Sequence, residues 1–384
     1  MTDRVYLDWN ATTPLRPEAR RAMAAAWDLC GNPSSVHAEG RHARRLVEEA
    51  RAAVAKAVGA LPRNVIFTSG GTEANALALT PGLRGVSKPP VERLLVSAIE
   101  HPSVLAGGRF SAGAVGKVGV TGGLVDLDQL RAMLTSGLPA LVSVMAANNE
   151  TGVIQPVAEA AEIVHAAGGL LHVDAIQALG KIPFNINAMG ADLATFSAHK
   201  IGGPKGVGAV VVSDSLAGLE PLLRGGGQEL GRRAGTENVA GIAGFGAAVE
   251  VAVNTLEQDA ARMLVLRNRL ETGLQASGLV AILARNASRL PNTTLFTAAG
   301  LKAETAVIAF DLEGIAVSSG SACSSGKVQP SHVLEAMGFP RDIAQGAVRL
   351  SLGWSTTEAD IDCCLEAWRK LASTLLNKER RNTA

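Results

Sequence analysis

The chain contains only four cysteines among its 384 residues, namely Cys30, Cys323, Cys363 and Cys364. Their spacing matches no zinc-binding pattern, so we predict no metal site and expect a reducing compartment, the cytoplasm. No apolar run approaches the roughly 18 residues of a membrane span, and the first residues lack the pattern of a signal peptide. The formal net charge is only +1, which gives no reason to expect a nucleic acid or an anionic membrane as a partner.

Apolar residues are plentiful by contrast. They make up 47% of the chain and charged residues 18%, which is typical of a large buried core, and the length indicates two domains. Helical patterns, such as those at 17–27, 38–58 and 156–167, alternate with short strand-like runs at 64–68, 94–98, 141–146, 170–173 and 193–196. This alternation predicts an α/β domain with a mixed, mostly parallel sheet flanked by helices.

The pattern changes beyond about residue 246. A long helix is expected over 247–276, followed by shorter strands near 280–283, 292–296 and 307–311, a last strand at 348–352 and a last helix at 358–376. We therefore predict a large domain over residues 15–250. Residues 1–14 and 251–384 are expected to form a smaller α+β domain.

Polar motifs follow the ends of the predicted strands. In open α/β sheets, ligands bind outside the carboxyl ends of the strands, so these motifs are candidates for one common site. They are the segments Ser69–Asn75, Glu100–Ser103, Asn148–Gly152, Asp174–Gln177 and Ser197–Lys200.

Lys200 lies at the rim of the predicted core, on a turn with four glycines and a proline after it. A crowded lysine loses its charge readily and can form a Schiff base, although a surface lysine in a hairpin turn is the alternative. Ser69–Thr72 opens a helix after a strand, which favours phosphate binding, with a simple helix cap as the alternative. The lysine of a nucleotide-triphosphate loop is absent from this turn.

Asp174 ends a buried strand and therefore needs a cationic or hydrogen-bonding partner, such as a protonated pyridine nitrogen. Together with Lys200 and a phosphate-binding turn, it completes the minimum set for pyridoxal phosphate. His101 ends a strand at the same rim, where it is a candidate to stack on the cofactor ring and move protons. The alternative for His101 is a purely structural role.

Cys323 lies among small residues, Ser318–Gly326, with no large side chain nearby to cover it. A cysteine on a small, exposed loop is a candidate nucleophile, and the alternative is a passive surface thiol.

Over nearly its whole length the chain resembles the cysteine desulfurases of the NifS/IscS type, which are class V aminotransferase-like enzymes of fold-type I. The motifs that carry this resemblance are Tyr6–Thr13, Ser69–Asn75, Glu100–His101, Asn148–Gly152, His172–Gln177, Ser197–Lys200 and Gly320–Cys323. The sequence departs from the family pattern at Trp354, where arginine is frequent.

The resemblance implies roles for the matching residues. Lys200 would carry the cofactor and later shuttle protons, Asp174 would pair with the ring nitrogen, and Gln177 would hydrogen-bond the ring oxygen. His101 would stack on the ring and act in acid–base steps. The phosphate would be held by a set of small polar residues: Gly71, Thr72, Ser197 and His199, with Thr236 reaching it from the partner subunit.

For the substrate, the resemblance implies that Arg349 and Asn149 clamp the carboxylate of L-cysteine. Cys323 would attack the substrate sulfur, keep it as a persulfide, and let the remainder leave as L-alanine. The resulting prediction is a homodimeric, cytoplasmic enzyme that depends on pyridoxal phosphate and feeds iron–sulfur cluster assembly.

Two alternatives remain open at this point. One is a selenocysteine lyase or another lyase of the same fold, against which Cys323 argues. The other is a non-catalytic protein that only docks scaffolds, and the intact set of Lys200, Asp174, His101 and Cys323 argues against it. The sequence does not identify the sulfur acceptor, which could serve nitrogenase, general iron–sulfur assembly or tRNA thiolation.

Overall fold

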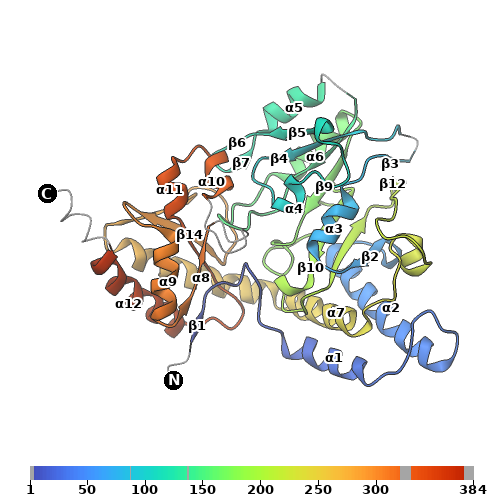
Figure 1. Ribbon diagram of the computed structural model, residues 1–384, viewed down its shortest axis with the longest axis horizontal. Coiled ribbons are helices and arrows are strands. Elements are labelled where there is room, and N and C mark those ends of the chain that lie inside the picture. Colours follow the sequence, from blue (N-terminus) through green and yellow to red (C-terminus); the bar gives the residue numbers. More distant parts are fainter. Residues whose placement is uncertain (1–3, 87, 136–137, 321–329, 376–384) are drawn as a thin grey trace.

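The computed structural model describes residues 4–86, 88–135, 138–320 and 330–375. Figure 1 shows two groups of elements, a large sheet with its helices and a smaller sheet with helices of its own. The N-terminal segment begins beside the smaller group and crosses to the larger one.

The large sheet has seven strands. Its order is β2 (Val65–Thr68), β11 (Gly208–Val212), β10 (Leu193–Ser197), β9 (Leu170–Asp174), β8 (Ala140–Ser143), β4 (Arg93–Ser97) and β5 (Val115–Val118). The pairs from β10 to β5 are parallel, and β11 runs antiparallel to both of its neighbours. The central strands are buried on both faces, which explains why they read as continuous apolar runs. The predicted mixed, mostly parallel sheet is confirmed, whereas β5 was not predicted.

Helices cover both faces of this sheet (Figure 1). They are α1 (Pro17–Trp27), α2 (Ala38–Val58), α3 (Gly71–Ala78), α4 (Pro102–Leu105), α5 (Leu127–Thr135), α6 (Val157–Ala166) and α7 (Val239–Asn254). In α2 the buried residues Ala43, Val47, Ala50 and Val54 recur at helical spacing, and the helix ends at Gly59, whose φ of 73° suits glycine.

Short elements complete this part. The strands are β3 (Arg84–Gly85), β6 (Val120–Thr121), β7 (Leu124–Val125) and β12 (Leu216–Ala217), and the 3₁₀ turns are η1 (Pro62–Asn64), η2 (Ala112–Ala114), η3 (Ala198–Lys200) and η4 (Gln228–Gly231).

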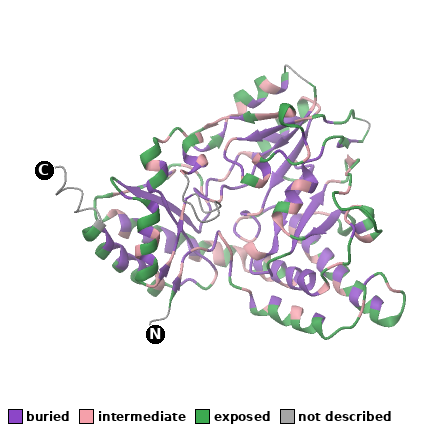
Figure 2. Ribbon diagram, in the orientation of Figure 1, coloured by how far each residue is buried: buried purple, intermediate pink, exposed green. Residues whose placement is uncertain are grey.

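The smaller sheet is antiparallel, in the order β13 (Val280–Ile282), β14 (Thr293–Ala298), β17 (Val348–Ser351) and β16 (Ser318–Ser319). Its helices are α8 (Leu256–Gln275), α9 (Ala303–Leu312), α10 (His332–Ala336), α11 (Arg341–Gly346) and α12 (Glu358–Leu375). β1 (Val5–Tyr6) pairs with β15 (Ile315–Ala316), which ties the N-terminus to this group. Figure 2 shows buried residues concentrated in the two sheets and on the helix faces turned toward them.

The single long helix predicted over 247–276 is wrong, because α7 and α8 are separate helices. Between them Thr255 bonds to Val251 O and to Asp259 Oδ2 through its hydroxyl, at 3.0 and 2.7 Å. No single helix among the described residues is long and apolar enough to cross a membrane; α7 and α8, bent by 70°, would qualify only as a pair, by length and composition. The predicted boundary at residue 250 falls inside α7, and the division into domains stays a prediction.

The strand predicted at 307–311 is also wrong, because these residues belong to helix α9. The β-branched pair Val307 and Ile308 favoured a strand, but the buried residues Ala303, Ala306 and Phe310 are spaced for a helix. Phe310 stacks on the buried Trp368 of α12, with ring centroids 6.3 Å apart. Packing therefore decides this segment against its local preference.

Candidate functional site

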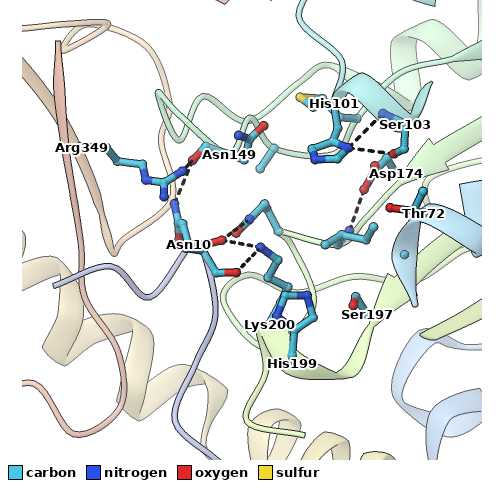
Figure 3. Close-up of a pocket in the computed structure, with 16 residues that line it drawn as sticks. Asn10, Thr72, His101, Ser103, Asn149, Asp174, Ser197, His199, Lys200 and Arg349 are labelled. Atoms are coloured by element: carbon cyan, nitrogen blue, oxygen red, sulfur yellow. Dashed lines mark hydrogen bonds between the residues drawn. The ribbon is translucent and has the colours of Figure 1, made fainter. Parts of the chain in front are cut away.

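A cavity of about 260 Å³ lies where the carboxyl ends of the parallel strands meet the N-terminal segment and β17. Figure 3 shows its residues pointing toward one another from these elements. Its lining consists of Asn10, Ala11, Gly71, Thr72, His101, Ser103, Met145, Ala147, Asn149, Asp174, Ile176, Gln177, Ser197, His199, Lys200 and Arg349. The cavity therefore unites every predicted site residue in the described part of the chain except Thr236.

Lys200 ends the η3 turn that follows β10, close to the centre of the site (Figure 3). Its Nζ donates hydrogen bonds to the carbonyl oxygens of Asn10 and Ala11, at 2.6 and 2.8 Å. The next turn passes Gly202, with φ 91°, where a Cβ would come within 2.4 Å of the Arg16 side chain. This close packing fixes the turn, and the two carbonyls fix the position of the amine.

Asp174 is buried at the end of β9 and pairs in register with Thr195 of the neighbouring β10. Its Oδ1 accepts from the backbone N–H of Ile176 and its Oδ2 from Asn75 Nδ2, both at 3.0 Å. Burial nevertheless raises the pKa of Asp174, while burial lowers the pKa of nearby His101. A cation placed beside Asp174 would offset the cost of burying its carboxylate.

A candidate anion site lies around the first turn of α3, on the same side of the cavity as Asp174 (Figure 3). Gly71 packs so closely that a Cβ would come within 2.4 Å of Ile176 Cδ1. Thr72 follows it, and the hydroxyl oxygen of Ser197 is buried without a hydrogen-bond partner in the described structure. His199 borders the same region, and burial lowers its pKa to about 4. An oxyanion here would meet the helix N-terminus and the hydroxyl of Ser197.

These features fit pyridoxal phosphate. The unpartnered Ser197 hydroxyl and the Gly71 turn suit the phosphate, the buried carboxylate of Asp174 suits a protonated ring nitrogen, and Lys200 suits the aldehyde. The fit rests on donors and acceptors that this chain already holds in place.

Arg349 of β17 lies at the edge of the cavity and is 2% exposed. Its guanidinium donates to the carbonyl of Asn149 at 2.9 Å and to Asp8 Oδ1 at 2.7 Å. The resemblance implied that Arg349 and Asn149 clamp the substrate together, and the structure adds a direct contact between the Arg349 guanidinium and the Asn149 backbone carbonyl. Asp8 was missed as a partner, even though it lies in the conspicuous Tyr6–Thr13 motif.

Sequence reasoning also missed Asn10 and Lys181. Lys181 is buried behind the site, and its Nζ donates to Asn10 Oδ1 at 3.0 Å and to Gln177 Oε1. Burial holds the pKa of Lys181 well below its ordinary value. Gln177 Nε2 in turn donates to the Asn10 carbonyl at 3.0 Å, so Asn10 links both residues to Lys200. The motif pointed to Asn10, but no local signal pointed to Lys181.

One predicted residue in the described part of the chain lies outside this cavity. Thr236 is exposed and borders a separate hollow with Ser69 and Arg233, and Arg233 is ion-paired with Glu73 of α3 at 3.0 Å. Cys323 lies outside the described residues, so its assignment as the nucleophile stays a prediction.

Residues 5–363 match the aminotransferase class-V family. The chain is 40% identical over 386 residues to the cysteine desulfurase IscS of Dictyoglomus turgidum, covering 98% of this chain and 96% of that protein. It is similar to the X-ray structure of a NifS-like protein from Rickettsia africae, with 36% identity, a TM-score of 0.86, and coverage of 96% of this chain and 99% of that one.

A structure of SspA in complex with cysteine is also similar, with 29% identity, a TM-score of 0.74, and coverage of 92% of this chain and 100% of that one. The match to the NifS-like structure confirms the predicted fold-type I architecture. Family, fold and site therefore agree, and the chain belongs to the aminotransferase class-V family, within which it is a cysteine desulfurase of the NifS/IscS type.

Proposed function

We propose that this enzyme works as a cytoplasmic homodimer, converts L-cysteine to L-alanine, and passes the sulfur from Cys323 to an iron–sulfur scaffold or another acceptor protein. The observation that carries the proposal is that Lys200, the Asp174 carboxylate, the first turn of α3 and Arg349 all line one cavity. The relative named SspA binds cysteine in its own structure, which supports the same substrate here.

The chemistry divides between the cofactor and the side chains. When bound, pyridoxal phosphate supplies an electron sink for the α-carbon of the substrate. Asp174 would keep the ring nitrogen protonated by pairing with it, and Gly71, Thr72, Ser197 and His199 would hold the phosphate. The Lys200 amine, oriented by two backbone carbonyls, is placed to hold the cofactor and then to take up the α-proton.

Arg349 would orient the substrate through its carboxylate. The guanidinium is held by the Asn149 carbonyl and by Asp8, so its position is set before the substrate arrives. Such preorganisation spares the substrate the entropic cost of ordering a long side chain. Cysteine would then be bound with its α-carbon directed toward Lys200.

Cys323 would receive the sulfur: its thiolate attacks the substrate sulfur, the carbon–sulfur bond breaks, and the persulfide stays on the protein. Ser318 of β16 pairs in register with Arg349 of β17, so the described part of this segment, which ends at Gly320, lies beside the residue that would clamp the substrate.

The homodimer would complete the cofactor site. Thr236 is exposed and lies outside the cavity of its own chain, which is what a residue that serves a partner subunit requires. The turn before it also exposes Leu230, at 71% of its surface. A second copy of the chain would cover this apolar side chain.

Reductive trapping of the cofactor tests the proposal. The purified protein should be yellow, and borohydride should attach the cofactor covalently to Lys200, as peptide mass mapping can show. Lys200→Ala should abolish both the attachment and the formation of alanine from cysteine. Lys205→Ala, which changes an exposed lysine on the same turn, is the matched control and should leave both intact. Trapping at another lysine, or alanine formation by Lys200→Ala, would refute the assignment.

A further inference from the structure

A continuous series of hydrogen bonds runs beneath the cavity, from the large sheet to His101. It links residues of three strands and two helices in the order Ser143, His172, Thr195, Asn75, Ser103 and His101. Neighbouring pairs are separated by 2.8, 3.3, 2.6, 2.9 and 2.8 Å. Every member except Ser103 and His101 is fully buried, so water is not available to exchange partners with the inner part of the series.

The amide of Asn75 fixes the direction of the series. Asn75 Nδ2 lies 3.0 Å from Asp174 Oδ2, and an ionised carboxylate can only accept a hydrogen bond. The amide nitrogen must therefore face Asp174, and its second hydrogen points to Ser103 Oγ at 2.9 Å. The amide oxygen consequently faces Thr195.

On the sheet side, the Thr195 hydroxyl donates its single hydrogen to Asn75 Oδ1 at 2.6 Å. It can then only accept from His172 Nε2, which leaves His172 Nδ1 to accept from Ser143. A neutral imidazole meets both demands, and burial lowers the pKa of His172 to about 3, so this ring stays neutral. The requirement at Asp174 thus sets the direction, and a neutral His172 is compatible with it.

On the cavity side, Ser103 Oγ accepts from Asn75 and is free to donate its own hydrogen to His101 Nδ1. The backbone N–H of Ser103 points to the same ring nitrogen at 3.1 Å, and a backbone N–H can only donate. His101 Nδ1 therefore faces two donors. A proton on Nδ1, whether in the other tautomer or in the charged ring, would oppose the Ser103 N–H.

We propose that this series fixes His101 as the neutral tautomer with its proton on Nε2, and that Asn75, Ser103 and Thr195 are positioning residues of the active site. Their side chains act on the reaction through His101 and Asp174. Asn75 holds both, because one amide group donates to Asp174 directly and to His101 through Ser103.

The tautomer has a chemical consequence, which rests on the proposed function. With Nε2 protonated and Nδ1 occupied by two donors, His101 presents a hydrogen-bond donor to the cavity, so in this state the ring can take part in acid–base steps as an acid but not as a base. Removal of the α-proton then falls to Lys200. His101 contributes a neutral ring and a hydrogen-bond donor, whose orientation is set by Ser103 and Asn75.

Nitrogen NMR of the cofactor-loaded protein, labelled with ¹⁵N-histidine, tests the tautomer without reference to activity. The His101 ring is assigned by the loss of its signals in His101→Gln. We expect the wild type to show a protonated Nε2 and an unprotonated Nδ1 at neutral pH. A protonated Nδ1 in the wild type would overturn the proposal, whatever the enzyme catalyses.

Two variants then test the series itself. Thr195→Val removes the hydroxyl that donates to Asn75 Oδ1, and Ser103→Ala removes one of the two donors to His101 Nδ1; both should shift His101 toward a mixture of tautomers. Thr195→Ser should restore the wild-type pattern, and Ser215→Ala, on an exposed loop, should not disturb it. If both hydroxyl-removing variants keep the pure Nε2–H form, the series does not set the tautomer. Alanine formation, assayed on the same samples, reports separately on the proposed function.

Discussion

Replacement of Glu229 by alanine should destabilise the fold far more than replacement of its neighbour Glu48, although both carboxylates bind the same arginine. Arg51 of α2 donates from two nitrogens, Nη1 and Nη2, to the two carboxylate oxygens of Glu229, at 2.7 and 3.0 Å. Only its Nε contacts Glu48, at 3.2 Å from Oε2. The Glu229 side chain is 2% exposed and that of Glu48 is 51% exposed. Glu229 also accepts from the backbone N–H of Phe67 at 3.0 Å.

The two positions therefore differ in what their loss leaves behind. Glu229→Ala strands a buried guanidinium and a buried N–H, which costs about 3–5 kcal/mol. Glu48→Ala breaks an exposed pair worth about 0–1 kcal/mol. Glu229 and Leu230 also have positive φ values, of 50° and 58°, so the ion pair holds a strained turn whose release offsets part of the loss.

Equilibrium unfolding in urea, followed by tryptophan fluorescence at one fixed protein and cofactor concentration, measures both effects. We expect Glu229→Ala to lower the free energy of unfolding by about 2 kcal/mol more than Glu48→Ala, because strain release reduces the difference between the middles of the two ranges. Equal losses in the two variants would refute the reasoning, because burial would then not distinguish the two pairs. The turn at Glu229 leads to Arg233 and Thr236, so the same variant should also weaken cofactor retention.

Three further outcomes are expected. Burial raises the pKa of Glu150 from 4.5 to about 7, so this carboxyl favours folding below pH 4.5 and loses that contribution as the pH rises through 7. Glu150→Gln should remove about 3 kcal/mol of this pH dependence from the free energy of unfolding in urea, and parallel plots of that free energy against pH for the wild type and the variant would contradict it. Cys323→Ser should still bind cofactor and cysteine but fail to release alanine, and wild-type turnover should rise with pH as the thiol ionises; alanine release at the wild-type rate would make Cys323 a passive residue. Mixed dimers of Lys200→Ala and Thr236→Ala subunits should regain partial activity, because one site then holds both residues, and no recovery after proven subunit exchange would place Thr236 within its own site.

The residues that the sequence identified share a simple property. Lys200, Asp174 and the turn at Gly71 follow apolar runs that could only be buried strands, and parallel strands bring their carboxyl ends to one edge. The pattern therefore predicted both the sheet and the position of these side chains. The strand predicted at 307–311 was wrong because the β-branched pair there outweighed the helical spacing of Ala303, Ala306 and Phe310, whose burial includes the packing of Phe310 on Trp368.

The residues that the sequence did not identify act through the backbone or through long-range packing. Asn10 holds Lys200 with its carbonyl oxygen, a group that every residue carries and no side-chain pattern reveals. Lys181 is a buried cation whose acceptors, Asn10 and Gln177, come from separate segments. The direction of the hydrogen bonds at Asn75 likewise depends on partners from other elements.

The attachment of the N-terminal segment has a consequence for the order of events during synthesis. Val5 pairs with Ile315, and Asp8 binds Arg349, so these residues wait for partners made more than 300 residues later. At about 5–20 residues per second this delay is about 15–70 s. Until then the segment is held beside Lys200 only by its contacts with the larger group, such as Gln177 Nε2 to the Asn10 carbonyl at 3.0 Å and the Thr13 N–H to the His199 carbonyl at 2.9 Å. The contacts with β15 and β17 therefore complete the anchoring of this segment only near the end of translation, after the large sheet has had time to form.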